Sequence, residues 1–114
     1  MRDLVLRTDD EGIASLTLNR PDALNALSPN LFIQLREHLE IINAQSEETG
    51  CVIIRGAGWS FSAGNDLRAI RSGDTAPSRH FQAETRELLE NLAQPVIASV
   101  QGHCYTGSLE FAIA

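Results

Sequence analysis

The fold is decided by the segment Cys51-Val-Ile-Ile-Arg-Gly-Ala-Gly-Trp-Ser-Phe-Ser-Ala-Gly-Asn-Asp-Leu67. Its first residues form a short apolar run, which is typical of a strand buried on both faces. A glycine-rich loop follows, and a helical segment comes after it. We expect Trp59 and Phe61 in this loop to be packing residues. The segment therefore predicts a buried strand and a helix joined by a loop whose backbone is open to a ligand.

Upstream of this segment, residues 3–7 and 12–19 alternate apolar and polar side chains, with a turn cluster between them. This alternation predicts a β-hairpin. Ser28-Pro29 is a helix-start signal, with Ser28 as the N-cap and proline in the first turn. Apolar residues then recur at helical spacing on one face. They predict an amphipathic helix over residues 29–45.

Downstream, Phe81 and a leucine cluster at 88–92 predict a second amphipathic helix, and residues 96–100 predict another buried strand. Equivalent elements recur about every 45 residues, which indicates a coiled repeat of ββα units in an α/β fold. An apolar helical pattern begins at Ser108 and reaches Ala114 without a cap. We therefore expect residues 1–114 to be the N-terminal part of a longer spiral domain.

Charge and composition exclude several classes of function. The net charge is −6 and all nine basic residues are arginine. A negative chain repels nucleic acid and anionic membranes, so we expect neither as a partner, and a cationic contact to phosphate must come from arginine. No run is long enough to cross a bilayer, and Cys51 and Cys104 lack a spaced set of metal ligands. These features predict a cytoplasmic protein without a metal.

Two glycines each lie just after a strand and just before a helical segment, at Gly64 and Gly107. The first N–H groups of a helix lack partners and favour negative charge, so two such ends directed at one point would make an oxyanion hole. Glu110 lies about one helical turn beyond Gly107 and would suit a general acid or base. The alternative is that Glu110 caps its helix, and Asp66 has the same alternative.

Three blocks resemble one known family when they are taken together. They are Leu18-Asn-Arg-Pro-Asp-Ala-Leu-Asn-Ala-Leu27, Phe61-Ser-Ala-Gly-Asn-Asp-Leu67, and Pro95-Val-Ile-Ala-Ser-Val-Gln-Gly102 with Thr106-Gly-Ser-Leu-Glu110. In this order they resemble the enoyl-CoA hydratase/isomerase, or crotonase, family. The match covers nearly the whole chain. The second motif departs from the common pattern, because a single glycine, Gly107, stands where many members have a run of glycines.

The resemblance implies a crotonase-like spiral of ββα units, truncated before the C-terminal helical region. It implies that the N–H groups of Asn65 and Gly107 bind the thioester oxygen and that Glu110 transfers protons. By their place in the motifs, Asn25 and Ala26 would border coenzyme A. The backbone from Ala63 to Leu67, which includes Asp66, would bind the adenine. Charge and proximity to the motifs suggest that Arg20 or Arg68 binds phosphates.

The resemblance further implies an enzyme of fatty acid metabolism that adds water across the 2,3-double bond of a 2-enoyl-CoA. A Δ3,Δ2-enoyl-CoA isomerase is the alternative within the family. A truncated, non-catalytic fragment that binds acyl-CoA or associates with other subunits is a third alternative. No cofactor is expected, since coenzyme A is part of the substrate. Relatives imply a homo-oligomer, a trimer or hexamer, and little activity from these 114 residues alone.

Overall fold

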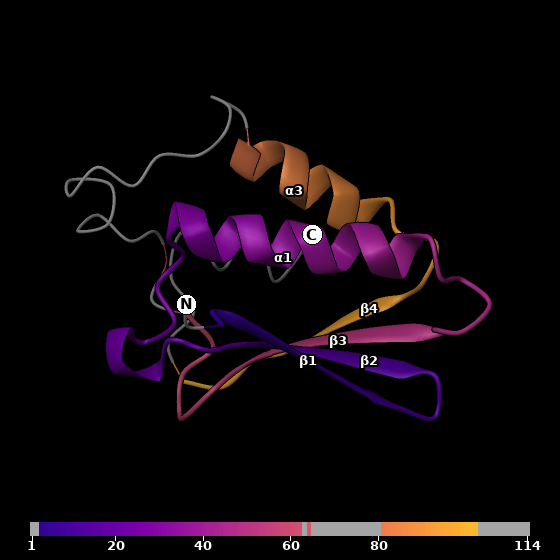
Figure 1. The fold of residues 1–114 in the computed structure, drawn as a ribbon. Helices are drawn as coiled ribbons and strands as arrows, with labels where there is room; N and C mark the ends of the chain where they lie inside the picture. Colours follow the sequence, from indigo (N-terminus) through magenta and orange to yellow (C-terminus); the bar gives the residue numbers. More distant parts are fainter. Residues whose placement is uncertain (1–2, 63, 65–80, 103–114) are drawn as a thin grey trace.

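The computed structural model describes residues 3–62, 64 and 81–102. Within them the chain forms strands, two α-helices and one short 3-10 helix (Figure 1). In chain order the elements are β1 (Val5–Asp10), β2 (Ile13–Leu18), η1 (Pro21–Ala23), α1 (Pro29–Asn43), β3 (Cys51–Gly56), α3 (Phe81–Glu90) and β4 (Val96–Ser99). The predicted hairpin, both amphipathic helices and the two later strands are confirmed. The short helix η1 was not predicted.

The strands form one mixed sheet in the order β1-β2-β3-β4. β1 and β2 pair antiparallel as a hairpin, whereas β2, β3 and β4 are parallel neighbours. Parallel neighbours need a crossover connection, and α1 and α3 lie in these two crossovers. Both helices lie on the same face of the sheet (Figure 1). The described residues therefore form one mixed sheet with a row of helices on one of its faces.

Helix α1 begins where the sequence predicted. Ser28 is the N-cap, and its side-chain oxygen accepts a hydrogen bond from the backbone N–H of Leu31 at 3.2 Å. This bond satisfies one of the N–H groups that a helix start leaves without a partner. The helix ends at Asn43, two residues earlier than the predicted 29–45, and the N–H of Ala44 still bonds back to Glu40 and Ile41.

The hydrophobic core lies between the sheet and α1. Alternate residues of β2 and β3 point into it, and they meet the apolar stripe of α1. The fully buried aliphatic side chains include Leu16, Leu18, Leu31, Leu35, Leu39, Ile42 and Val52. Burying one side chain of this kind contributes about 1.5–3 kcal/mol relative to leaving it exposed.

The prediction that the later strands are buried on both faces is wrong for the described residues. Only one face of β3 is covered, with Val52 and Ile54 buried and Arg55 exposed. On the opposite face Ile53 pairs in register with Ile97, which is 54% exposed. The described helices cover one face of the sheet, and a short apolar run does not reveal how many faces of its strand are covered.

Arg36 links helices α1 and α3 at the surface. Arg36 on α1 contacts Glu40 of its own helix at 2.9 Å and Glu84 of α3 at 3.1 Å. The hydrogen bond to Glu40, and to a lesser extent that to Glu84, raises the pKa of the Arg36 guanidinium. Exposed ion pairs contribute little to stability, so the apolar contacts between the helices and the core hold α3 in place.

Candidate functional site

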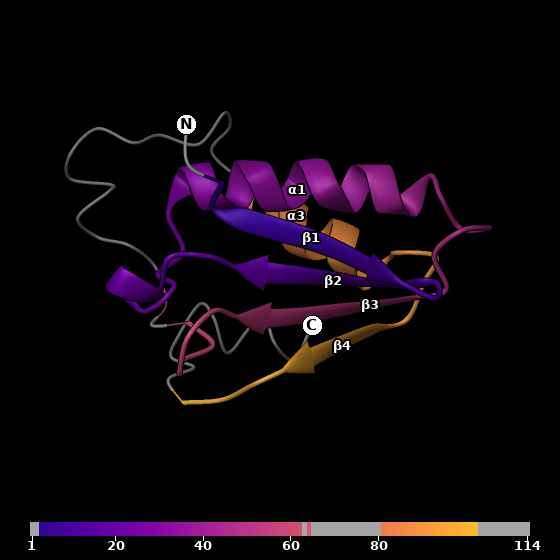
Figure 2. The ribbon, with the colours of Figure 1, turned by 60° about the horizontal axis from the view of Figure 1, so that its bottom comes forward.

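Three segments leave the sheet at the same end, because β2, β3 and β4 are parallel. Figure 2 shows their arrowheads pointing the same way, opposite to β1. The segments are residues 19–28 after β2, residues 57–62 with Gly64 after β3, and residues 100–102 after β4. In open α/β sheets ligands bind beyond the carboxyl ends of the strands. This edge is therefore the candidate site, and each of the three motif blocks reaches it.

Backbone hydrogen bonds join the three segments side by side. The N–H of Leu27 donates to the carbonyl oxygen of Gly64 at 2.7 Å. The N–H of Phe61 donates to the carbonyl oxygen of Gln101, also at 2.7 Å. The segment after β2 is thus bonded to the segment after β3, which is bonded in turn to the segment after β4. This arrangement supports the predicted ββα repeat.

Asn25 connects the first two segments. It is fully buried with a positive φ of 54°, a conformation that asparagine tolerates better than most residues. Its side-chain amide donates to the carbonyl oxygens of Ala57 at 2.9 Å and Ser60 at 2.8 Å. Its side-chain oxygen accepts from the N–H of Arg20 at 2.8 Å. The side chain of Asn25 therefore holds the loop after β3 in place.

The loop after β3 folds back closely on the end of its strand. A Cβ atom added to Gly56 would lie 2.3 Å from the carbonyl oxygen of Ser60 and 2.5 Å from that of Phe61. Real Cβ atoms do not approach other atoms so closely, so only glycine fits this position. Ser62 then donates to the carbonyl oxygen of Asn25 at 2.8 Å, and its side-chain oxygen accepts from the N–H of Gly64 at 3.2 Å. These bonds fix Ser62 and Gly64, the residue before Asn65 in the sequence.

Of the predicted site residues, the structure brings Arg20, Asn25 and Ala26 together. The guanidinium of Arg20 donates to the carbonyl oxygen of Ala26 at 3.0 Å. Asn25 was predicted to border coenzyme A, but the polar atoms of its side chain are already bonded to the protein. The other predicted residues lie outside the described part of the chain: Ala63, Asn65, Asp66, Leu67, Arg68, Gly107 and Glu110.

The two aromatic residues of this loop have different surroundings. Phe61 is fully buried in the core, as predicted for a packing residue. Trp59 is 63% exposed, so the same prediction is wrong for Trp59. Trp59 lies in a turn with Gly58, whose φ is 78°, and this turn carries the indole away from the core. An exposed tryptophan at this edge was missed because its residue type alone favours packing.

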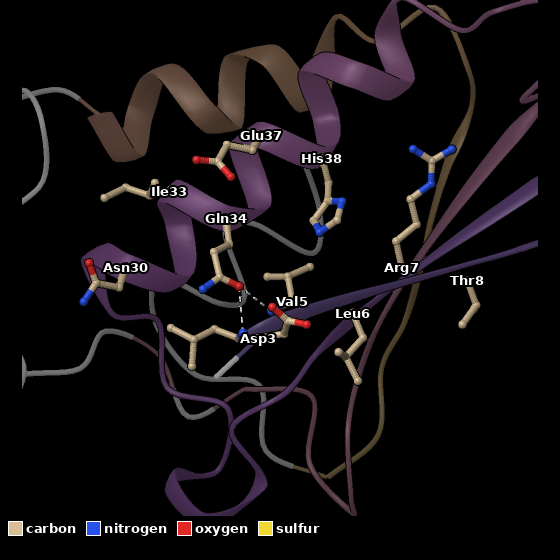
Figure 3. Close-up of a pocket in the computed structure, with 11 residues that line it drawn as sticks. Asp3, Val5, Leu6, Arg7, Thr8, Asn30, Ile33, Gln34, Glu37 and His38 are labelled. Carbon is tan, nitrogen blue, oxygen red and sulfur yellow. Dashed lines mark hydrogen bonds between the residues drawn. The ribbon is translucent and has the colours of Figure 1, made fainter. Parts of the chain in front are cut away.

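An open groove of about 1010 Å³ lies elsewhere, between β1 and α1 (Figure 3). Gln34 lines it and accepts hydrogen bonds from the N–H groups of Leu4 at 2.7 Å and Val5 at 3.2 Å. His38 is half-buried and lines this groove. None of the predicted site residues that the structure describes lines it. The groove is thus distinct from the strand-end site.

Within the described ranges, no cluster of three or more His, Cys, Asp or Glu side chains could hold a metal ion. Neither described α-helix combines the length and the apolar composition that a bilayer crossing needs.

Known proteins match this chain along nearly its whole length. A Bacillus subtilis protein named as an enoyl-CoA hydratase/isomerase is 38% identical over 119 residues, which is 100% of this chain and 45% of that protein. Ethylmalonyl-CoA decarboxylase of Homo sapiens is 35% identical, covering 96% of this chain and 36% of that enzyme. The crystal structure of an enoyl-CoA hydratase/isomerase from Xanthobacter autotrophicus Py2 superimposes with a TM-score of 0.88 at 30% identity, covering 97% of this chain and 43% of that one.

The sheet, its helix layer and the strand-end loops define an α/β protein of the crotonase fold, as predicted. Residues 8–114 match the family described as enoyl-CoA hydratase/isomerase, and the chain belongs to this family. It spans less than half the length of the relatives described above.

Asn25 is expected to stabilise the chain through its amide and not through its volume. We expect Asn25→Ala to lower the free energy of unfolding by about 2 kcal/mol, because it removes the side-chain donor to the buried carbonyl group of Ser60 and the part-buried one of Ala57. Asn25→Asp has nearly the same shape but presents an acceptor to the Ala57 and Ser60 oxygens, so it should destabilise at least as much. Urea unfolding measures both, with exposed Asn91→Ala as the control. A harmless Asn25→Asp would contradict this role.

Proposed function

We propose that the chain binds an acyl-CoA thioester at the carboxyl ends of β2, β3 and β4. The observation that carries this proposal is the hydrogen-bonded loop after β3. Asn25 and Gln101 bond to this loop from the two neighbouring segments. Gly64, which is bonded to Ser62, is the residue directly before Asn65 in the sequence. A fixed loop suits a backbone N–H that must be aimed at an oxygen in advance. The family of the chain supports a thioester as the ligand.

We propose that the full gene product hydrates 2-enoyl-CoA. The N–H groups of Asn65 and Gly107 would bind the thioester oxygen and stabilise the negative charge that builds up on it. Glu110 would act as the general acid or base. Water loses a proton as its oxygen bonds to C3, the double-bond electrons move toward the thioester, and C2 then takes up a proton. The net change is the addition of one water molecule.

The Δ3,Δ2-enoyl-CoA isomerase is the second candidate, because the matched family includes both hydratases and isomerases. An isomerase moves a proton from C2 to C4 and uses the same enolate stabilisation, so the oxyanion hole would serve either reaction. A chain that binds acyl-CoA without turnover is the third candidate. Assembly as a homo-oligomer and a cytoplasmic location also belong to this proposal.

Product analysis distinguishes these candidates. The full gene product is incubated with a 2-enoyl-CoA and, separately, with a 3-enoyl-CoA. We expect 3-hydroxyacyl-CoA from the 2-enoyl substrate, and the 114-residue chain should bind the thioester with little turnover. A 2-enoyl product from the 3-enoyl substrate, without hydration, would favour the isomerase. Binding without either product would leave the non-catalytic alternative, and no binding would overturn the proposal.

A further inference from the structure

Trp59 is the only tryptophan of the chain, and it lies at the candidate site with 63% of its surface exposed. Two residues later Phe61 is fully buried, so the loop directs one aromatic side chain into the core and leaves the other at the surface. Aromatic side chains gain more from burial than most others, and a flat indole is a good surface for stacking another ring. The exposed part of the ring at this edge offers a stacking surface for the aromatic component of a ligand.

The turn that carries Trp59 is held on both sides. The side-chain amide of Asn25 bonds to the carbonyl oxygens of Ala57 and Ser60, which flank the turn. The side-chain amide of Gln101 donates to the carbonyl oxygen of Gly58 at 2.6 Å. A Cβ atom added to Gly102 would lie 2.2 Å from the carbonyl oxygen of Trp59, so the segment after β4 packs directly on this residue. A backbone fixed in this way reduces the entropy lost when a ligand binds.

A cationic residue lies in the segment beside the turn. A Cβ atom added to Gly58 would lie 3.3 Å from Cβ of Pro21, which follows Arg20 directly. Arg20 is anchored on this segment by its hydrogen bond to the carbonyl oxygen of Ala26. Figure 2 shows η1, which begins at Pro21, at the same end of the sheet as the turn after β3. An indole and a guanidinium on neighbouring segments are complementary to a purine nucleotide, with one ring to stack and phosphates to pair.

We infer that Trp59 stacks on the adenine ring of coenzyme A and thereby binds the nucleotide end of the thioester. This inference rests on the proposed function, since it assigns a binding residue to the same site. The purine is the aromatic part of coenzyme A, whereas the pantetheine arm is not aromatic. Trp59 is therefore a binding residue, and it does not contact the reacting carbons.

Fluorescence of the single tryptophan reports directly on this contact. The 114-residue chain is titrated with coenzyme A, with adenosine 3′,5′-bisphosphate as the nucleotide end, and with pantetheine as the other end. We expect the first two ligands to quench the emission and pantetheine to leave it unchanged. Quenching by pantetheine alone would overturn the inference.

Calorimetry with Trp59 variants measures how much the indole ring contributes to the binding of coenzyme A. We expect Trp59→Ala to raise the Kd of coenzyme A by about 10- to 100-fold, since stacking of a base on an aromatic side chain has this magnitude. Trp59→Phe keeps a ring and should lose less. Ile97→Ala removes another exposed apolar side chain, on the open face of the sheet, and serves as the matched control with an unchanged Kd.

The outcomes separate this inference from the proposed function. If Trp59→Ala binds coenzyme A as tightly as the unchanged chain, the stacking role is overturned and acyl-CoA binding survives. If the unchanged chain does not bind coenzyme A, both are overturned. Thermal unfolding of the Trp59 variants should match that of the unchanged chain, because the ring is exposed, so a change in Kd reflects binding and not misfolding.

Discussion

Replacing Gly56 with alanine is expected to lower the free energy of unfolding by about 3 kcal/mol, the upper range for forcing atoms into a packed interior. The new Cβ would lie 2.3 Å from the carbonyl oxygen of Ser60, 2.5 Å from that of Phe61 and 2.8 Å from the side-chain nitrogen of Asn25. Two of these atoms belong to the backbone, and the third is part of the amide that holds the loop. The loop must therefore move away from the end of β3.

Gly50→Ala is the matched control, because Gly50 lies just before β3 and Gly56 ends it. A Cβ atom on Gly50 would meet its nearest neighbour, the carbonyl oxygen of Gly12, at 3.9 Å, which is ordinary contact. We expect a change within about 0.5 kcal/mol, as for most surface substitutions. Urea unfolding of both variants gives the comparison. Equal destabilisation by the two substitutions would show that the close approach at Gly56 has no special role.

Replacing Glu110 with glutamine is expected to lower kcat of the full gene product by about 10²- to 10⁴-fold, the usual contribution of a general acid or base. Glutamine keeps the size of the side chain but cannot accept and return a proton at neutral pH. Binding should persist, because the proposed contacts to the thioester oxygen come from backbone N–H groups. The hydration rate and the Kd of coenzyme A are measured side by side.

Glu90→Gln, an exposed residue at the end of α3, serves as the control for loss of one negative charge. Its kcat should match that of the unchanged protein. Unchanged turnover in Glu110→Gln would remove Glu110 from the mechanism. Loss of binding together with turnover would instead indicate that Glu110 caps its helix and stabilises the local fold.

Local patterns were sufficient to predict most of the fold. The alternation in residues 12–19 follows the two faces of β2, and the bond between Ser28 and Leu31 is the cap that the sequence indicated. Both signals arise within a few residues, where the spacing of residues in the sequence directly determines the local backbone structure. The prediction that β3 is buried on both faces was wrong, because the burial of a strand depends on which faces of the sheet distant helices cover.

The site could be predicted only in part. Asn25 was identified through a motif and expected at the edge of the ligand, yet its side chain bonds to Ala57 and Ser60, which lie 32 and 35 residues away. No local pattern reports contacts over such a separation. Trp59 was missed for the same reason, since its exposure depends on a turn and on the neighbouring segment after β4.

The most direct test is the structure of the full gene product bound to an acyl-CoA analogue that it cannot turn over. We expect the thioester oxygen about 3 Å from the backbone nitrogens of Asn65 and Gly107, the spacing of an oxyanion hole. A thioester bound elsewhere, for example in the groove between β1 and α1, would contradict the proposal, as would two nitrogens directed at different points.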